Sequence, residues 1–148
     1  IAAAVVNASI SGDTTSGGRT RLPALLAQHK PTHVIVELGG NDALRGQPLA
    51  ATRANLEAMA QSAQGTGAKV LIVGMKLPPN YGSAYVREFD ALFAEVAKAR
   101  KAGYVPHLFD GFGEDMAYFQ SDRIHPTREA QPKMLATVWP ALRPLLAK

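Results

Sequence analysis

Short apolar runs alternate with longer amphipathic segments along this chain. The apolar runs, such as VVNASI, HVIVEL and KVLIVG, are rich in β-branched residues and nearly continuous rather than alternating. Continuous runs of this kind are typical of strands that are covered on both faces of a parallel sheet. We predict strands at residues 5–9, 34–38 and 68–73, and a short, weak strand within 105–110.

The segments between these runs carry apolar residues at helical spacing. They predict helices within residues 19–30, 48–67, 83–103 and 127–146. Pro31 should close the first of these helices, and Pro132, Pro140 and Pro144 should make the last one irregular. Strands and helices therefore alternate, which predicts an α/β domain with a mostly parallel sheet.

Composition sets a size and excludes several classes of protein. At 148 residues, with 47% hydrophobic and 19% charged, the chain is expected to form one domain, residues 1–148, around one core. Because it has no cysteine, disulfides, thiolate metal sites and a cysteine nucleophile are excluded. The net charge is +4, but the basic residues are scattered, so we expect no nucleic-acid binding. No run of about 18 apolar residues occurs, and we expect no integral membrane contact.

Ligand sites in parallel α/β sheets lie beyond the carboxyl ends of the strands. This rule points to the loops after Ile10, Leu38 and Val73, which also hold the unusual residues. In the GGND motif at residues 39–42, glycines let the backbone approach a ligand, and the Asn41 amide can donate a hydrogen bond to a developing oxyanion. A plain strand-to-loop turn would use the same residue types.

The turn at Gly12 also has two interpretations. Its backbone N–H could donate to the same oxyanion as Asn41. Otherwise the segment is a plain turn, in which Asp13 or Thr14 caps the helix that follows.

An acid–histidine pair, Asp122 and His125, lies near the end of the chain. A carboxylate three residues before a histidine can hold the imidazole Nδ1–H and leave Nε2 to take a proton from a hydroxyl. In the alternative, Asp122 caps backbone amides at a helix entry and His125 is a surface residue before Pro126. The spacing alone does not decide between them.

The remaining histidines, His29, His33 and His107, are expected to be structural or solvated. No group of His, Asp and Glu has convincing metal-ligand spacing. The phenylalanines are expected in the core rather than around a cofactor: Phe89, Phe93, Phe109, Phe112 and Phe119.

Three segments together resemble the SGNH, or GDSL, hydrolases, most closely the bacterial branch of thioesterase I, lysophospholipase L1 and arylesterase. They read VVNASISGDTTSGGRTRLPALLAQHKPTHVIVELGGNDALRG, LPPNYG and DRIHPTREAQP, in the family's order, from about Val5 to the end. The resemblance implies a three-layer α/β/α, flavodoxin-like fold with a parallel sheet. It also implies a catalytic triad with His125 as the general base and Asp122 as its partner, and an oxyanion hole formed by Gly12 and Asn41.

The LPPNYG loop resembles the mobile loop that borders the acyl pocket in this branch. We therefore expect it to bind substrate and to influence the preferred acyl-chain length. Its candidate substrate-binding residues are Leu77, Pro78, Asn80 and Tyr81.

The family's nucleophile has no counterpart in these residues. In this branch the block NASISGDT carries the oxyanion glycine, and the Gly-Asp-Ser-Leu serine lies on an earlier, first strand, which is apparently absent here. The strands at 5–9 and 34–38 would then flank a gap in the sheet. Three explanations stay open: a longer natural protein, which we favour, a fragment that rearranges or dimerises, or a substitute hydroxyl from Ser11, Thr14 or Ser16.

We expect the intact protein to be a serine esterase or thioesterase, without a cofactor, that hydrolyses small acyl esters or thioesters through an acyl-enzyme. The alternative is a catalytically silent, truncated hydrolase that acts as a binding module, or as a homodimer that compensates for the missing strand. The sequence leaves the natural substrate open, and a periplasmic or a cytoplasmic location in a bacterium is equally compatible with it.

Overall fold

The computed structural model describes residues 2–147. From Thr15 onward its helices and strands follow the predicted order, with one additional short helix. Three short 3₁₀ turns, Pro79–Tyr81, Met116–Tyr118 and Arg128–Ala130, lie between the main elements. The main elements are α1 (Thr15–His29), β1 (His33–Val36), α2 (Gly40–Leu44), α3 (Leu49–Gly65), β2 (Lys69–Val73), α4 (Ser83–Ala99), β3 (Gly103–Val105) and α5 (Gln131–Leu146).

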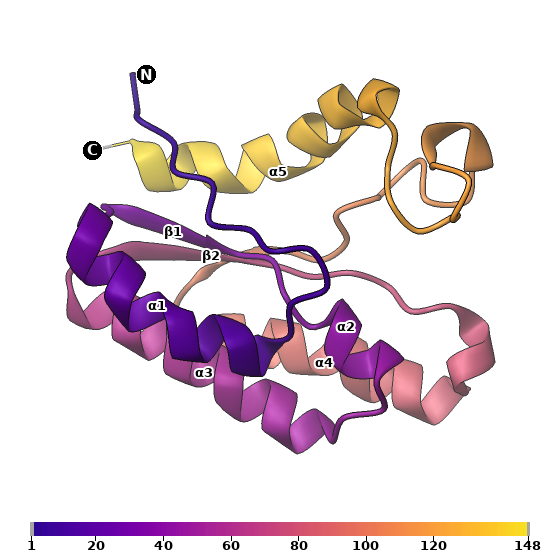
Figure 1. Cartoon of the computed structure of the whole chain (residues 1–148), viewed down its shortest axis with the longest axis horizontal. Coiled ribbons are helices and arrows are strands. Elements are labelled where there is room, and N and C mark those ends of the chain that lie inside the picture. Colours follow the sequence, from indigo (N-terminus) through magenta and orange to yellow (C-terminus); the bar gives the residue numbers. More distant parts are fainter. Residues whose placement is uncertain (1, 148) are drawn as a thin grey trace.

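The three strands form a parallel sheet in the order β1-β2-β3. Figure 1 shows α1, α3 and α4 on one face of this sheet and α5 on the other. The three-layer α/β/α arrangement with a parallel sheet is therefore confirmed. Because all strands run the same way, their carboxyl ends meet at one edge, where loops can assemble a site.

The continuous apolar run of β2 is explained by burial on both faces. Val70 and Ile72 belong to the core formed with α3 and α4, whereas Leu71 and Val73 pack with residues of α5. Side chains of a strand alternate between faces, so a strand between two helical layers needs apolar residues at every position. The predicted core phenylalanines are buried, apart from Phe109, which is partly buried.

The predicted strand at residues 5–9 is wrong. Residues 2–10 are extended but pair with no strand among the described residues, and Val5 is 90% exposed. Figure 1 shows this segment running from the side of α5, past β1, to the start of α1. A strand needs a neighbour for its N–H and C=O groups, and here the bonds are local or come from a side chain, as when Arg21 Nη1 donates to the Ala8 carbonyl at 2.9 Å.

Two other boundaries differ from the prediction for local reasons. β1 ends at Val36 because the chain turns at Gly39 and enters α2, a short helix that the hydrophobic pattern did not predict. The last strand is Gly103–Val105, before most of the predicted range, since Pro106 has no N–H for a further ladder bond. The final helix begins at Gln131, after a 3₁₀ turn, and runs unbroken through Pro140 and Pro144.

Candidate active site

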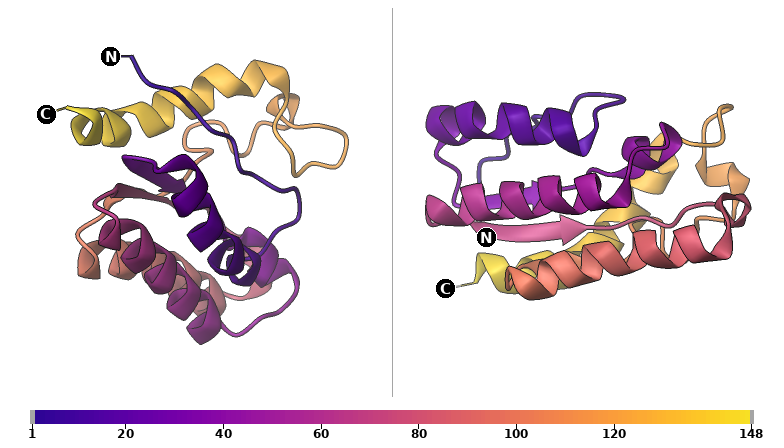
Figure 2. Two further views of the ribbon diagram at one scale, coloured as in Figure 1. Left: turned by 60° about the vertical axis from the view of Figure 1, so that its left-hand side comes forward. Right: turned by 90° about the horizontal axis from the view of Figure 1, so that it is seen from below.

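The loops that precede α1, follow β1 and precede α5 gather at one end of the sheet, the carboxyl end of its strands (Figure 1, Figure 2). These segments carry Gly12, the pair Asp122 and His125, and Asn41, which lies in α2 directly after the β1 loop. The fold therefore brings the candidate segments to the edge where ligands of parallel sheets bind.

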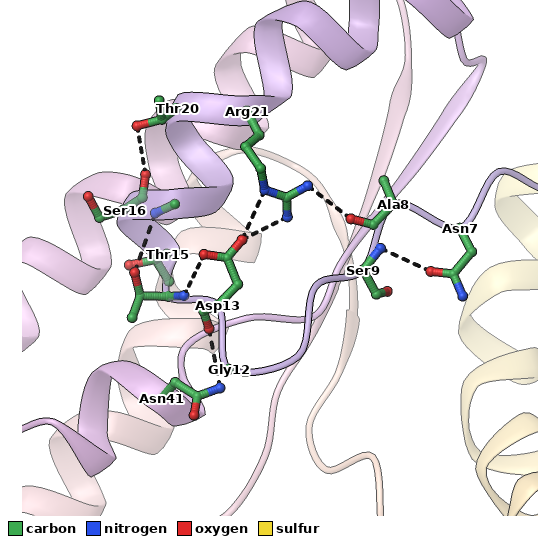
Figure 3. Close-up of polar contacts among 12 residues, drawn as sticks. Asn7, Ala8, Ser9, Gly12, Asp13, Thr15, Ser16, Thr20, Arg21 and Asn41 are labelled. Atoms are coloured by element: carbon green, nitrogen blue, oxygen red, sulfur yellow. Dashed lines mark hydrogen bonds and ion pairs between the residues drawn. The ribbon is translucent and has the colours of Figure 1, made fainter.

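Hydrogen bonds join the Gly12 loop to both ends of α2. The Asn41 side chain donates from Nδ2 to the Asp13 carbonyl at 3.2 Å (Figure 3). Arg45 Nη2 donates to the Gly12 carbonyl at 3.0 Å. Gly12 has a φ of +79°, which a residue with a side chain rarely adopts. Within residues 2–147 the Gly12 N–H has no acceptor, and the second N–H of the Asn41 amide is also available.

Arg21 fixes the same loop from α1, and sequence reasoning did not find it. Its Nε and Nη2 donate to Asp13 Oδ2 at 3.0 and 2.7 Å, and its Nη1 holds the Ala8 carbonyl (Figure 3). A guanidinium that binds one carboxylate with two N–H groups is a geometrically specific pair. The eight-residue separation of Asp13 and Arg21 has no local signature, so no sequence signal pointed to it.

The hydroxyl-bearing residues near Gly12 differ in burial and in hydrogen bonding. Thr14 is buried and caps α1, because its Oγ1 accepts from the Gly17 N–H at 3.3 Å. This decides the capping question in favour of Thr14 over Asp13. Ser11 and Ser16 are exposed, and among the described residues neither hydroxyl hydrogen-bonds to a histidine.

Asp122 and His125 are held together by a ring-to-carboxylate hydrogen bond. His125 Nδ1 lies 2.6 Å from Asp122 Oδ2, and Oδ1 of the same carboxylate accepts the backbone N–H groups of Ile124 and His125 at 2.9 and 3.0 Å. One carboxylate thus holds the imidazole and also accepts two backbone N–H groups of its own loop, although no helix begins there. The hydrogen bond from the His125 ring, followed by the two backbone N–H groups, lowers the pKa of Asp122 to about 2.

Backbone contacts with residues 119 and 120 hold the chain at His125 and at the residue after it. Gln120 donates from its backbone N–H to the His125 carbonyl at 2.8 Å, and Phe119 pairs with Pro126 in an isolated bridge. Phe119 is buried in a small cluster with Phe112 and Ala130. The imidazole is exposed, and within the described residues its Nε2 has no hydrogen-bond partner.

The LPPNYG residues divide between core and surface. Leu77 is buried in the core between the sheet and α4, whereas Pro78 and Asn80 are exposed. Tyr81 is half-buried and stacks on Tyr85, with ring centroids 6.2 Å apart. Pro78, Asn80 and Tyr81 are thus accessible to a ligand.

The other histidines contact neighbouring parts of the fold or are exposed to solvent. His33 Nε2 lies 2.7 Å from the Leu145 carbonyl, and His29 is exposed at the end of α1. His107 packs edge-on against Phe109, and burial lowers its pKa. Among residues 2–147, no three His, Asp or Glu side chains gather as metal ligands, and no helix combines the length and apolar character needed to cross a membrane.

A histidine–carboxylate pair and amide donors at the carboxyl edge of a parallel sheet are groups from which acyl hydrolases build active sites. The chain belongs to the GDSL-like Lipase/Acylhydrolase family, whose model matches residues 2–131.

Named relatives agree with this assignment. Esterase TesA of Pseudomonas aeruginosa is 53% identical over 142 residues, covering 96% of this chain and 71% of that protein. Thioesterase 1/protease 1/lysophospholipase L1 of Escherichia coli K12 is 42% identical over 142 residues, covering 96% and 68%. The crystal structure of TesA superposes with a TM-score of 0.93 at 52% identity, covering 96% of this chain and 79% of that one. The enzyme class defined by these relatives is carboxylic ester hydrolase.

Proposed function

We propose that this protein is a serine esterase that hydrolyses acyl esters or thioesters through an acyl-enzyme, with a nucleophilic serine outside these 148 residues. The observation that carries the proposal is the bond between Asp122 and His125. It fixes the proton on Nδ1 and leaves Nε2 as the acceptor, which is what a general base for a serine hydroxyl requires.

The chemistry proceeds in two halves. The serine oxygen attacks the acyl carbon while His125 Nε2 takes its proton, and the resulting oxyanion receives hydrogen bonds from the Gly12 N–H and the Asn41 amide. Collapse expels the alcohol or thiol, which takes the proton from His125. Water then attacks the acyl-serine by the same route, with His125 again as base and then acid.

Asp122 supports each proton transfer. Its low pKa keeps it ionised at neutral pH, so it stabilises the imidazolium that forms when His125 holds the proton. The LPPNYG loop supplies the accessible residues Pro78, Asn80 and Tyr81 to the acyl chain.

An open position beside β1 supports the placement of the missing serine. β1 is an edge strand of the sheet, and Ile35 on its α5 face is 49% exposed. Leu135 and Trp139, four residues apart on α5, are also exposed, at 61% and 38%. A strand followed by a helix would cover the strand edge and these apolar side chains together.

The exposed residues Leu135 and Trp139 lie on the flank of α5 that is nearer to β1. Thr137 and Pro140 line a shallow depression together with residues that include Tyr104 of β3, so that flank of α5 faces the β3 edge. Successive residues of a helix are rotated by about 100°. Leu135 and Trp139 therefore point away from the flank that carries Thr137 and Pro140. One strand–helix unit of about 30 residues fits this position, and its strand would deliver a serine to the carboxyl edge.

The test is the intact mass of the purified natural protein before and after a fluorophosphonate that labels activated serines. We expect a mass above 15.7 kDa, one adduct on a serine outside these residues, and hydrolysis of a p-nitrophenyl ester. His125→Ala should lose both labelling and hydrolysis, whereas His29→Ala, at an exposed helix end, should keep them.

The other outcomes separate the alternatives. An adduct on Ser11 or Ser16 would identify a substitute nucleophile. A protein with neither labelling nor hydrolysis would favour the silent binding module and contradict the esterase proposal.

A further inference from the structure

Asp42, the residue after Asn41, is a buried carboxylate at the centre of a hydrogen-bond network that the proposed mechanism does not use. It is 1% exposed. Its Oδ1 accepts the Thr15 backbone N–H at 2.8 Å, and its Oδ2 accepts the Thr15 hydroxyl and the Thr52 hydroxyl, the latter at 2.8 Å. Within residues 2–147 it has no basic partner.

The direction of the hydrogen bonds is fixed by a fourth residue. Asn55 Nδ2 donates to Thr15 Oγ1 at 3.1 Å, so the single proton of that hydroxyl points at Asp42. The carboxylate of Asp42 therefore acts only as an acceptor. A buried carboxylate without hydrogen-bond donors is strongly disfavoured. If Thr15 or Thr52 moved away, the carboxylate of Asp42 would therefore be left buried with too few donors.

The network ties together the two segments that carry the oxyanion donors. Thr15 is the first residue of α1, three positions after Gly12, and Asp42 adjoins Asn41 in α2. Thr52 comes from α3, which packs along α1 through the core. The Asp42 network is thus a buried three-helix junction under the Gly12 and Asn41 loops.

α2 depends on such an anchor. It has five residues, Gly40–Leu44, and no side-chain cap. A helix of this length is not stable by itself, because nucleation is not offset by propagation. The bonds from Asn41 and Arg45 to the Gly12 loop are not fully buried, so water competes with them.

We infer that Asp42 is a positioning residue: it holds α2 against the start of α1, so that Gly12 and Asn41 keep the spacing needed to bind one oxyanion. This inference rests on the proposed esterase function. Asp42 touches no reacting atom. Its hydrogen bonds direct its charge toward Thr15 and Thr52, away from the site in which negative charge develops.

A purely structural role makes a different prediction. If Asp42 only stabilised the fold, variants that remain folded would have unchanged kcat and KM. A positioning role requires kcat to fall while KM changes little, because the oxyanion exists only in the transition state and the intermediate.

The experiment uses the complete natural protein, including its nucleophile, and a p-nitrophenyl ester. Thr52→Val removes one donor to Asp42 at nearly constant volume, and Asp42→Asn changes the acceptor itself. Thr137→Val is the control, since this half-buried residue lies on α5, away from the Asp42 network, and its hydroxyl donates to the Lys133 carbonyl within the same helix. Each variant is assayed well below its own Tm.

We expect Asp42→Asn to lower kcat by about 10²-fold, the effect of misplacing a catalytic group by about 1 Å, with KM within about two-fold. Thr52→Val should show a smaller loss of the same kind, and Thr52→Ser should recover most of it. Unchanged kcat in folded Thr52→Val and Asp42→Asn, or an equal loss in Thr137→Val, would overturn the inference.

A second readout does not depend on activity. In ¹⁵N-labelled protein, Thr52→Val should shift the Gly12 backbone amide and the Asn41 side-chain amide, whereas Thr137→Val should leave them in place. If the parent protein is inactive, the esterase proposal fails, and these two signals alone decide the role of Asp42. Unmoved signals in a folded Thr52→Val protein would overturn it.

Discussion

A histidine and a carboxylate can lie three residues apart in any loop; what matters is which atoms they use. Asp122 divides its two oxygens between the His125 ring and two backbone N–H groups, so one carboxylate both orders the loop and orients the imidazole. Likewise, Asn41 donates one side-chain N–H to the Gly12 loop, and within the described residues its other N–H has no acceptor. The bonds that order these loops therefore leave the donor and acceptor atoms of the proposed mechanism available.

Asn41→Ala should separate transition-state stabilisation from substrate binding. Loss of one oxyanion donor is expected to lower kcat of the complete protein by about 10²–10³-fold with little change in KM. Steady-state kinetics on a p-nitrophenyl ester measures both, with Gln28→Ala on the exposed face of α1 as the control. A rise in KM at constant kcat would instead mean that Asn41 binds the ground state.

Glu37 gives a prediction about pH. The protein atoms around its carboxyl group reduce hydration and raise the pKa of Glu37 from 4.5 to about 7. The residue as a whole is nevertheless exposed to solvent. Between these pH values the folded state holds a proton that the unfolded chain has released, so stability should fall as pH rises through this window.

Urea unfolding of the 148-residue chain between pH 4 and pH 8, with and without Glu37→Gln, checks this prediction. The variant should gain stability relative to the parent as pH rises through the window. Glu114→Gln, in an exposed loop, controls for removal of a carboxylate. Parallel pH profiles for the parent and Glu37→Gln would show that burial does not favour the protonated form.

At the scale of elements, the sequence predicted the helices and strands whose apolar spacing is set by their own burial. It did not predict the elements whose structure depends on contacts with distant residues. α3, α4 and β2 were found because their apolar spacing is set by their own burial. α2 was not, since it is held by contacts from α1 and α3 rather than by its own propensity. The strand at residues 5–9 failed because pairing needs a neighbour that periodicity cannot supply.

The same division applies to the candidate site. The family resemblance pointed to Gly12, Asn41, Asp122 and His125, and their catalytic roles stay predictions. The structure adds the hydrogen bond between Asp122 and His125, the contact of Asn41 with the Gly12 loop and the positive φ of Gly12. Arg21 and Asp42 escaped notice because their partners lie 8 and 27 residues away, without a motif to link them. Positioning residues of this kind appear only when the chain is folded.

The junction between β1 and α2 provides a test at this scale. Gly39 has a φ of +126°, and a Cβ there would lie 2.7 Å from Phe93 Cζ in the core. Gly39→Ala should therefore destabilise the protein by more than the about 1–3 kcal/mol typical of a strained backbone position. Gly67→Ala, at a φ of +89° with open space around it, isolates the backbone contribution. Equal losses in urea unfolding would exclude the clash with Phe93.

At the scale of the whole molecule, the uncovered features lie together rather than at random. β1 is an edge strand, and Leu135 and Trp139 are exposed on the α5 flank assigned to its side. Val5, Val6 and Ile10 are exposed in the segment that runs past β1 (Figure 1). An apolar edge strand with unpaired N–H and C=O groups is a template for another strand. The strand of the proposed serine unit would fill this edge, and in its absence another copy of the chain offers the same pairing groups.

Residues 1–148 expressed alone should therefore self-associate as concentration rises, whereas a protein that carries the proposed serine strand should remain monomeric. Sedimentation velocity over about a hundred-fold range of concentration measures this mass-action behaviour. Ile35→Lys places a charge on the exposed edge and should weaken the association, because edge lysines oppose strand addition. Met116→Lys adds the same charge at an exposed apolar residue outside this region. A monomer at every concentration would mean that the β1 edge does not recruit another copy. Equal weakening by both lysines would mean that association uses a surface other than the β1 edge.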